Sequence, residues 1–269
     1  MSGAQPAVLV DRRGSVVEIR LNRPEQLNAL DVPTFQEFRA HLGRAARDDS
    51  VRAVILTGAG RAFSAGGDVA AMERASEAGT LPQFFHDLTG EQELAVREIL
   101  SMSKPVLAAL PGVAAGGGLS LALAADWRIG TPETLLVPAF PSLGAVPDGG
   151  LTYLLPHFLG IGLAQELLFT AARVPAEQAR HMALLHEIVD GKELGARSWA
   201  RADELATGPT FAYGWMKRLM VAAFSGSLET QLALERRGAV EAASRHELPE
   251  GIRAFRAKRR PDFPRSKPT

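Results

Sequence analysis

The fold is decided by residues 105–125, which read PVLAALPGVAAGGGLSLALAA. A short apolar run, Pro105 to Leu110, opens the segment and is typical of a buried strand. A glycine-rich turn, Gly112 to Gly118, comes next, and good helix formers continue from Leu119 to Ala125. The order of strand, glycine turn and helix predicts a crossover unit of an α/β protein.

A similar unit lies upstream. The apolar run Val51 to Thr57 predicts a second buried strand, and a loop with a short helix follows from Ala62 to Ala75. A longer helix is expected over Leu81 to Ser101, and Asp126 to Ile129 predicts a third short strand. Because strands and helices alternate along the chain, we expect an α/β fold with crossover connections.

The two ends of the chain differ in pattern. Near the N-terminus, Val8 to Val10 and Ser15 to Leu21 predict a β-hairpin, and the apolar spacing of Val32 to Ala46 predicts an amphipathic helix. After Gly150 the pattern is helical. The predicted helices cover residues 151–159, 161–171, 175–182, 192–206, 211–224, 228–246 and 249–258. Since Gly208-Pro209 interrupts this pattern, we divide the chain into a core, residues 1–206, and a helical C-terminal region, residues 207–269.

The composition excludes several classes of protein. The chain has 30 basic and 30 acidic residues, so it lacks the basic excess of a typical nucleic-acid binder. It has no cysteine, which excludes disulfides, thiolate metal sites and a cysteine nucleophile. Its histidines show no metal-binding pattern. Met1 to Val10 does not resemble a signal peptide, and no apolar run reaches the roughly 18 residues of a membrane span. We therefore expect a soluble cytoplasmic protein without a metal.

Two clusters of small residues carry the first chemical signal. They are Ala62 to Asp68 and Gly112 to Gly118, and each follows a predicted strand and leads into a predicted helix. Free backbone N–H groups gather at helix N-termini, and small residues let a ligand approach them. Two such loops on adjacent strands could direct two N–H donors at one oxygen, as in an oxyanion hole. The alternative is that both clusters are simply tight turns.

In combination, several motifs resemble the crotonase (enoyl-CoA hydratase/isomerase) superfamily. They occur in the family's order over nearly the whole chain. They are Leu21 to Leu30, Ala65 to Asp68, Pro111 to Gly118, Phe140 to Gly150, Leu154 to Pro156 and Gly251 to Arg259. The resemblance implies a spiral of ββα repeats with a helical C-terminal region, assembled as trimers or paired trimers (hexamers). It also implies an acyl-CoA substrate, with coenzyme A entering as part of that substrate and no separate cofactor.

The resemblance further implies a set of site residues. The amides of Ala65 and Gly117 match the two donors to the thioester oxygen. The remaining positions that match substrate or coenzyme A contacts are Gln26, Leu27, Gly67, Asp68, Ser120, Phe140, Phe255 and Lys258. The last two match residues that often come from a neighbouring subunit. The alternative for this basic C-terminal segment is an ordinary solvated helix face.

The reaction depends on acid–base residues, and here the chain departs from the family's hydratases. Those enzymes usually use two glutamates, at positions that Ser120 and Phe140 occupy in this chain. One carboxylate remains in register, Asp148, at a position where some isomerases and an aryl-CoA dehalogenase carry an acid. A double-bond shift needs only one base, whose pKa is best raised by apolar walls. The alternative is that Asp148 caps the following helix.

Three functions follow from these observations. The first is an enoyl-CoA isomerase in which Asp148 shuttles the proton. The second is an enoyl-CoA hydratase with non-standard acid–base groups, and the third is a catalytically silent acyl-CoA binding protein. In the dehalogenase hypothesis, Asp148 would act as a nucleophile and a positioned histidine would also be needed. His86 lies in the right region of the sequence, but its spacing does not match.

Overall fold

The larger of two sheets has six strands in the order β1-β2-β3-β5-β7-β10 in the computed structural model, which describes residues 5–264. Its strands are β1 (Val8–Arg13), β2 (Val16–Leu21), β3 (Ala53–Gly58), β5 (Val106–Leu110), β7 (Trp127–Gly130) and β10 (Glu187–Ile188). The β1–β2 pair is the antiparallel hairpin that the sequence predicts, and all other neighbours are parallel. Parallel neighbours require crossover connections, which confirms the predicted α/β class.

A smaller sheet has the order β4-β6-β8-β9 and was missed by the sequence prediction. Its strands are β4 (Ala62–Ser64), β6 (Val113–Ala115), β8 (Leu135–Val137) and β9 (Val174–Pro175). Both predicted glycine loops therefore begin with a strand, and β4 pairs with β6 in parallel. Strands of two or three residues are too short to show an alternating pattern, which explains the error.

The helices agree closely with the prediction. Those of the core are α1 (Val32–Arg47), α2 (Val69–Glu77), α3 (Leu81–Ser101), α4 (Gly117–Ala124), α5 (Leu151–Leu159), α6 (Ile161–Thr170), α7 (Ala176–His181) and α8 (Leu194–Ala206). Two short 3-10 helices are η1 (Pro24–Gln26) and η2 (Phe140–Leu143). Every residue of α4 is buried, so this short helix is held by packing on all sides. Its N-terminus is consequently fixed in the interior.

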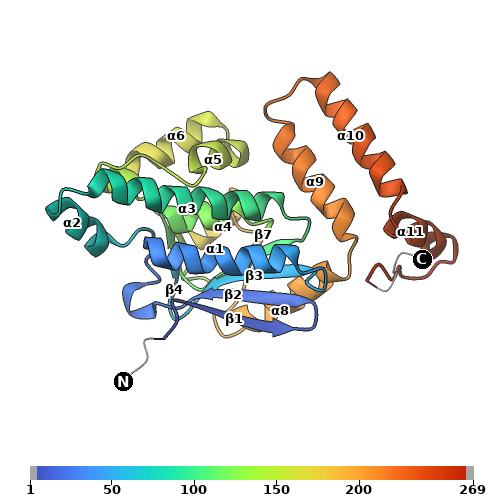
Figure 1. The fold of residues 1–269 in the computed structure, drawn as a ribbon, viewed down its shortest axis with the longest axis horizontal. Coiled ribbons are helices and arrows are strands. Elements are labelled where there is room, and N and C mark those ends of the chain that lie inside the picture. The colour runs from blue at the N-terminus through green and yellow to red at the C-terminus, as the bar shows by residue number, and fades with distance from the viewer. Residues whose placement is uncertain (1–4, 265–269) are drawn as a thin grey trace.

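Helices cover both faces of the larger sheet (Figure 1). On one face, α1 and α3 pack against the sheet with Phe35, Phe38 and Ile99 fully buried. On the other face, Trp199 of α8 packs against strand residues such as Ile55. In the described part of the chain, no helix is both long enough and apolar enough to cross a membrane.

The last three helices extend to one side of the core (Figure 1). They are α9 (Thr210–Ala222), α10 (Leu228–Ala243) and α11 (Glu247–Arg256), which we call the C-terminal arm. Helix α8 ends at Ala206 and α9 begins at Thr210, on either side of the predicted boundary. Residues 1–4 and 265–269 of the two predicted regions lie outside the described residues.

An ion pair between a buried lysine and a partly buried aspartate joins the C-terminal arm to the core. Lys217 of α9 donates from Nζ to Asp126 Oδ2 at 2.8 Å and to the backbone oxygen of Ile99 at 2.8 Å. Apolar side chains on α9, on α10 and in the turn between them are left exposed, namely Met216, Met220, Phe224, Leu228, Leu232 and Val240. An exposed apolar surface of this kind is typical of a contact with another protein chain.

Candidate active site

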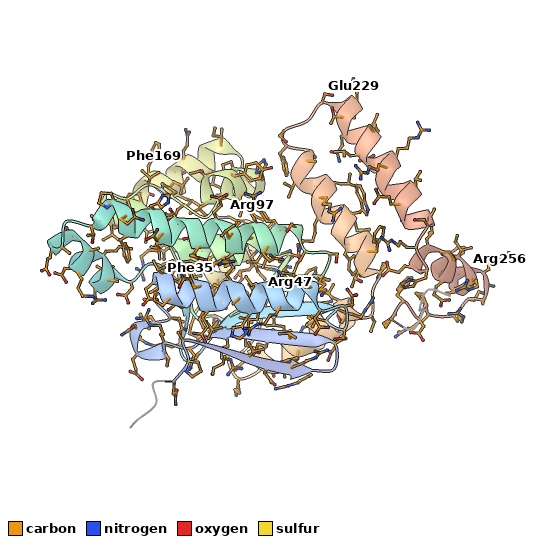
Figure 2. All side chains as sticks on the ribbon, viewed as in Figure 1. Phe35, Arg47, Arg97, Phe169, Glu229 and Arg256 are labelled. Carbon is orange, nitrogen blue, oxygen red and sulfur yellow. The ribbon has the colours of Figure 1, made fainter. Side chains whose placement is uncertain are left out.

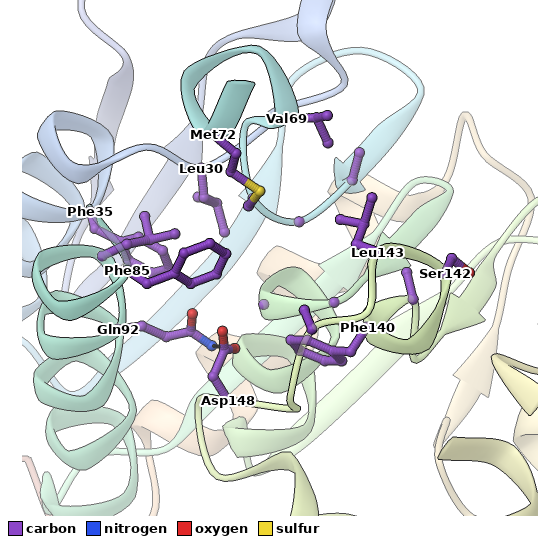
Figure 3. A pocket seen from close by; sticks show the side chains of 18 residues that line it. Leu30, Phe35, Val69, Met72, Phe85, Gln92, Phe140, Ser142, Leu143 and Asp148 are labelled. Atoms are coloured by element: carbon purple, nitrogen blue, oxygen red, sulfur yellow. Dashed lines mark hydrogen bonds between the residues drawn. The ribbon is translucent and has the colours of Figure 1, made fainter. Parts of the chain in front are cut away.

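A cavity of about 270 Å³ lies where the two glycine loops, α3 and η2 converge (Figure 3). Apolar side chains make up most of its wall, and the larger ones are Leu30, Phe35, Val69, Met72, Phe85, Leu88, Phe140 and Leu143. The polar side chains at the wall belong to Gln92, Ser142 and Asp148. Asp148 is the only ionisable residue among those that line the cavity within residues 5–264.

The two glycine loops meet backbone against backbone. Gly66 has a φ of +91°, and a Cβ built there would lie 2.8 Å from the backbone oxygen of Ala115. A Cβ at Gly118 would lie 2.7 Å from Ser64 Cβ. Because neither position has space for a side chain, glycine is required there by close approach, and at Gly66 also by the positive φ.

The N–H groups of Gly67 and Gly117 at this junction have no acceptor within residues 5–264. Gly117 is the first residue of α4, so its N–H has no partner within the helix. Among the hydrogen bonds of residues 5–264, none uses the N–H of Gly67. Gly67 and Gly117 both line the cavity. The positive end of the α4 dipole lies at Gly117 and favours negative charge nearby.

The prediction that the Ala65 amide is an oxyanion donor is wrong. Ala65 lines the cavity, but its N–H donates to the backbone oxygen of Leu27 at 2.9 Å. The pairing continues as Asp68 N donates to Leu30 O at 2.9 Å. Between them, Gly66 N donates to Ser64 Oγ at 3.1 Å. Within residues 65–68, Gly67 is therefore the one free N–H donor among the described hydrogen bonds.

Asp148 lies in the cavity wall and does not cap α5, so the helix-cap alternative is wrong. The N-cap of α5 is Gly150, without a side-chain hydrogen bond. Instead, Asp148 Oδ1 accepts from Gln92 Nε2 at 2.8 Å. Burial raises the pKa of Asp148 to about 6, and the Gln92 hydrogen bond partly opposes this rise. A carboxyl group with this pKa is well suited to accept and return a proton near neutral pH.

Ser120 and Phe140, the positions of the missing glutamates, have different roles here. Phe140 lines the cavity with an apolar ring. Ser120 is fully buried, does not line the cavity, and donates from Oγ to the backbone oxygen of Asp148 at 2.9 Å. Ser120 therefore fixes the loop that carries Asp148, rather than contacting a substrate.

Gln92 was missed by the sequence prediction. It follows Leu88 by one helical turn on the buried face of α3 and is itself buried. The signal was present, since a glutamine at a core-facing helix position is unusual and requires a hydrogen-bond partner. His86, the histidine considered for a dehalogenase, is exposed on α3 and is absent from the cavity wall.

The other predicted coenzyme A contacts lie outside the cavity wall. Asp68 is the N-cap of α2 and pairs with Arg23 Nη2 at 2.8 Å. Gln26 is exposed on η1, next to the half-buried Leu27. Phe255 is 85% exposed on α11, and Lys258 follows it. Figure 2 shows Arg256, which adjoins Phe255, far from Phe35 at the cavity. A single chain therefore does not bring Phe255 and Lys258 to the cavity.

Comparison with known proteins gives a consistent result. The family model for enoyl-CoA hydratase/isomerase matches residues 11–266. The chain is 37% identical over 248 residues to a 1,2-epoxyphenylacetyl-CoA isomerase of Escherichia coli, covering 92% of this chain and 94% of the relative. It is 38% identical over 245 residues to a probable enoyl-CoA hydratase of Rhodobacter capsulatus, covering 91% and 93%.

Solved structures show the same fold. An enoyl-CoA hydratase from Polaromonas superposes with a TM-score of 0.90 at 29% identity and covers 95% of this chain and 99% of its own. A putative enoyl-CoA hydratase from Streptomyces coelicolor has a TM-score of 0.89 at 32% identity and covers 98% of each chain. The predicted crotonase-like spiral is thereby confirmed, and the chain belongs to the enoyl-CoA hydratase/isomerase family.

Proposed function

We propose that this protein moves the double bond of an enoyl-CoA, with Asp148 as the proton shuttle and the amides of Gly67 and Gly117 as the oxyanion hole. The observation that carries the proposal is the cavity wall, where one carboxylate and two free backbone donors come together. Among the described residues that line the cavity, none besides Asp148 is ionisable. Coenzyme A would enter as part of the substrate.

The proposed chemistry needs only these groups. The Asp148 carboxylate removes a proton from C2 of a 3-enoyl-CoA, and the electrons move into the thioester carbonyl to give a dienolate. The N–H groups of Gly67 and Gly117 stabilise the negative oxygen. Protonated Asp148 then returns the proton at C4, and the double bond forms between C2 and C3. The raised pKa of Asp148 supports both steps, because the group must gain and lose a proton.

The same wall argues against ordinary hydration. Adding water requires one group to activate it and a proton for C2. Phe140 has no polar side-chain atom, and Ser120 Oγ is hydrogen-bonded outside the cavity wall. Gln92, the neighbour of Asp148, cannot accept a proton as a base. In a dehalogenase, Asp148 would act as a nucleophile and form an ester that water must hydrolyse. No second base lies in the described cavity wall to activate that water.

The relatives include proteins named as isomerases and proteins named as hydratases. The similarity to a protein named 1,2-epoxyphenylacetyl-CoA isomerase favours isomerisation. The similarity to a protein named probable enoyl-CoA hydratase keeps hydration as the alternative. The aromatic side chains of Phe35, Phe85 and Phe140 in the wall indicate an apolar acyl group.

A trimer or a dimer of trimers forms part of the proposal. The exposed apolar side chains of the C-terminal arm, such as Met220 and Phe224, support association with further copies. In such an assembly Phe255 and Lys258 would be supplied to the coenzyme A of a neighbouring subunit. The ammonium of Lys258 suits a phosphate group.

Isomerisation is tested directly with a 3-enoyl-CoA. We expect the purified protein to convert it to the conjugated 2-enoyl-CoA, followed by absorbance and mass spectrometry. Formation of 3-hydroxyacyl-CoA from a 2-enoyl-CoA would instead support the hydratase. Tight binding of several acyl-CoA thioesters without turnover would support the silent binding protein.

A further inference from the structure

We infer that Gln92 is a positioning residue, which holds one oxygen of Asp148 and leaves the other to carry the proton. This inference rests on the proposed function, because it specifies how the shuttle is held. It is carried by the hydrogen bond from Gln92 Nε2 to Asp148 Oδ1 at 2.8 Å and by the packing around the Gln92 amide. Figure 3 shows Gln92 reaching from α3 toward Asp148.

The Gln92 side chain is held in place by burial. Gln92 is 2% exposed and lies among Leu88, Ala95 and Val96 on the inner face of α3. Burying an amide costs free energy unless its polar atoms are hydrogen-bonded. A shorter apolar residue would complete this face of α3 without that cost. The buried amide is therefore explained best by its contact with Asp148.

Two glycines provide the space for the Gln92 amide. A Cβ at Gly149 would lie 1.9 Å from Gln92 Nε2, and a Cβ at Gly117 would lie 2.9 Å from Gln92 Oε1. Gly149 also has a φ of +57°, which favours glycine. The amide thus lies between the loop that carries Asp148 and the N-terminus of α4. It sets the position of the proposed base relative to the proposed oxyanion hole.

The hydrogen bond has a consequence for the proton transfer. Nε2 of a glutamine can only donate, so Oδ1 of Asp148 acts as its acceptor before and after the proton is taken up. The proton is then carried on Oδ2. Because Oδ2 both removes the proton from C2 and returns it at C4, the two transfers occur on one face of the substrate. The hydrogen bond also favours the ionised carboxylate, which opposes the effect of burial on the pKa of Asp148.

The test replaces Gln92 by methionine, which has a similar length and no donor. We expect kcat for isomerisation to fall by about 10- to 100-fold with a smaller change in KM. The acid limb of the kcat/KM–pH profile, near pH 6 in the parent protein, should move to higher pH because the ionised carboxylate loses its donor. In Gln92→Glu, which keeps the shape, a second carboxylate beside Asp148 should move the limb further in the same direction.

The matched control is Gln36→Met, which makes the same change on the exposed face of α1. It should leave kcat and the pH profile unaltered. If Gln92→Met lowers kcat but the acid limb stays in place, Gln92 is only a packing residue and the inference is wrong. An unchanged kcat in both Gln92 variants would also contradict it.

A second readout separates this inference from the proposed function. The ¹³Cγ resonance of Asp148, identified by its loss in Asp148→Asn, can be titrated without any substrate. We expect its midpoint to rise by about one pH unit in Gln92→Met. If this midpoint rises but the protein shows no isomerisation, the role of Gln92 toward Asp148 stands and only the proposed function is overturned. No rise would overturn the role of Gln92, even in an active isomerase.

Discussion

Replacing Asp148 by asparagine should lower the rate of isomerisation by about 10²- to 10⁴-fold. Asparagine keeps the size of the side chain and an oxygen that can accept from Gln92 Nε2, but it cannot take up a proton. The loss should appear in kcat, since the wall that holds the acyl group is unchanged. The matched control is Asp87→Asn, the same change at an exposed position of α3, which should retain full activity. A fully active Asp148→Asn variant would show that Asp148 is not the base.

The same substitution should increase the stability of the fold at neutral and alkaline pH. The pKa of Asp148 is raised from 3.8 to about 6 in the folded protein, so its ionised form lowers the free energy of unfolding. That penalty is fully present above about pH 6 and fades as the pH falls toward the unfolded value. We expect Asp148→Asn to gain about 1–3 kcal/mol at pH 8, and less at pH 5, by urea unfolding. A less stable variant at pH 8 would mean that the carboxylate is structural.

Replacing Lys217 by methionine should destabilise the protein by about 3–5 kcal/mol. The buried Lys217 and the partly buried Asp126 form an ion pair at 2.8 Å between α9 and the core. Methionine would leave the partly buried Asp126 without its cation, and desolvation already raises the pKa of that carboxyl. Thermal and urea unfolding would measure the loss.

Two further variants define the cause of that loss. Lys192→Met removes an exposed lysine 3.9 Å from Asp190 and should change the stability by less than about 1 kcal/mol. The double variant Asp126→Asn, Lys217→Met should recover part of the loss, because no charge stays buried alone. The loss of the double variant is compared with the summed losses of Asp126→Asn alone and Lys217→Met alone. If the two values are equal, the ion pair does not attach the C-terminal arm.

Much of the fold could be predicted from the sequence because long elements carry a clear period. The helix over Leu81–Ser101 was predicted with its exact bounds, and the strand Val106–Leu110 within one residue. The missed strands, such as β4 (Ala62–Ser64), are too short for a period. Their pairing depends on contacts between distant segments, which one sequence does not reveal.

The candidate site was predictable as a region but not atom by atom. Glycine-rich loops after strands indicated where free amides gather, and Gly117 at the start of α4 agrees with that reasoning. The choice between Ala65 and Gly67 depends on which N–H pairs with Leu27, a tertiary contact. Likewise, Gln92 is 56 residues from Asp148 in the chain, and only the packing of α3 against the Asp148 loop brings them together.

Transfer of a proton from C2 to C4 by Asp148 can be followed with a substrate deuterated at C2. The 3-enoyl-CoA is converted in ordinary water, and the product is analysed by mass spectrometry and NMR. We expect part of the 2-enoyl-CoA to carry deuterium at C4, transferred on the same face, and Asp148→Asn to abolish this transfer. A product whose C4 hydrogen comes entirely from solvent, formed equally fast by Asp148→Asn, would contradict it.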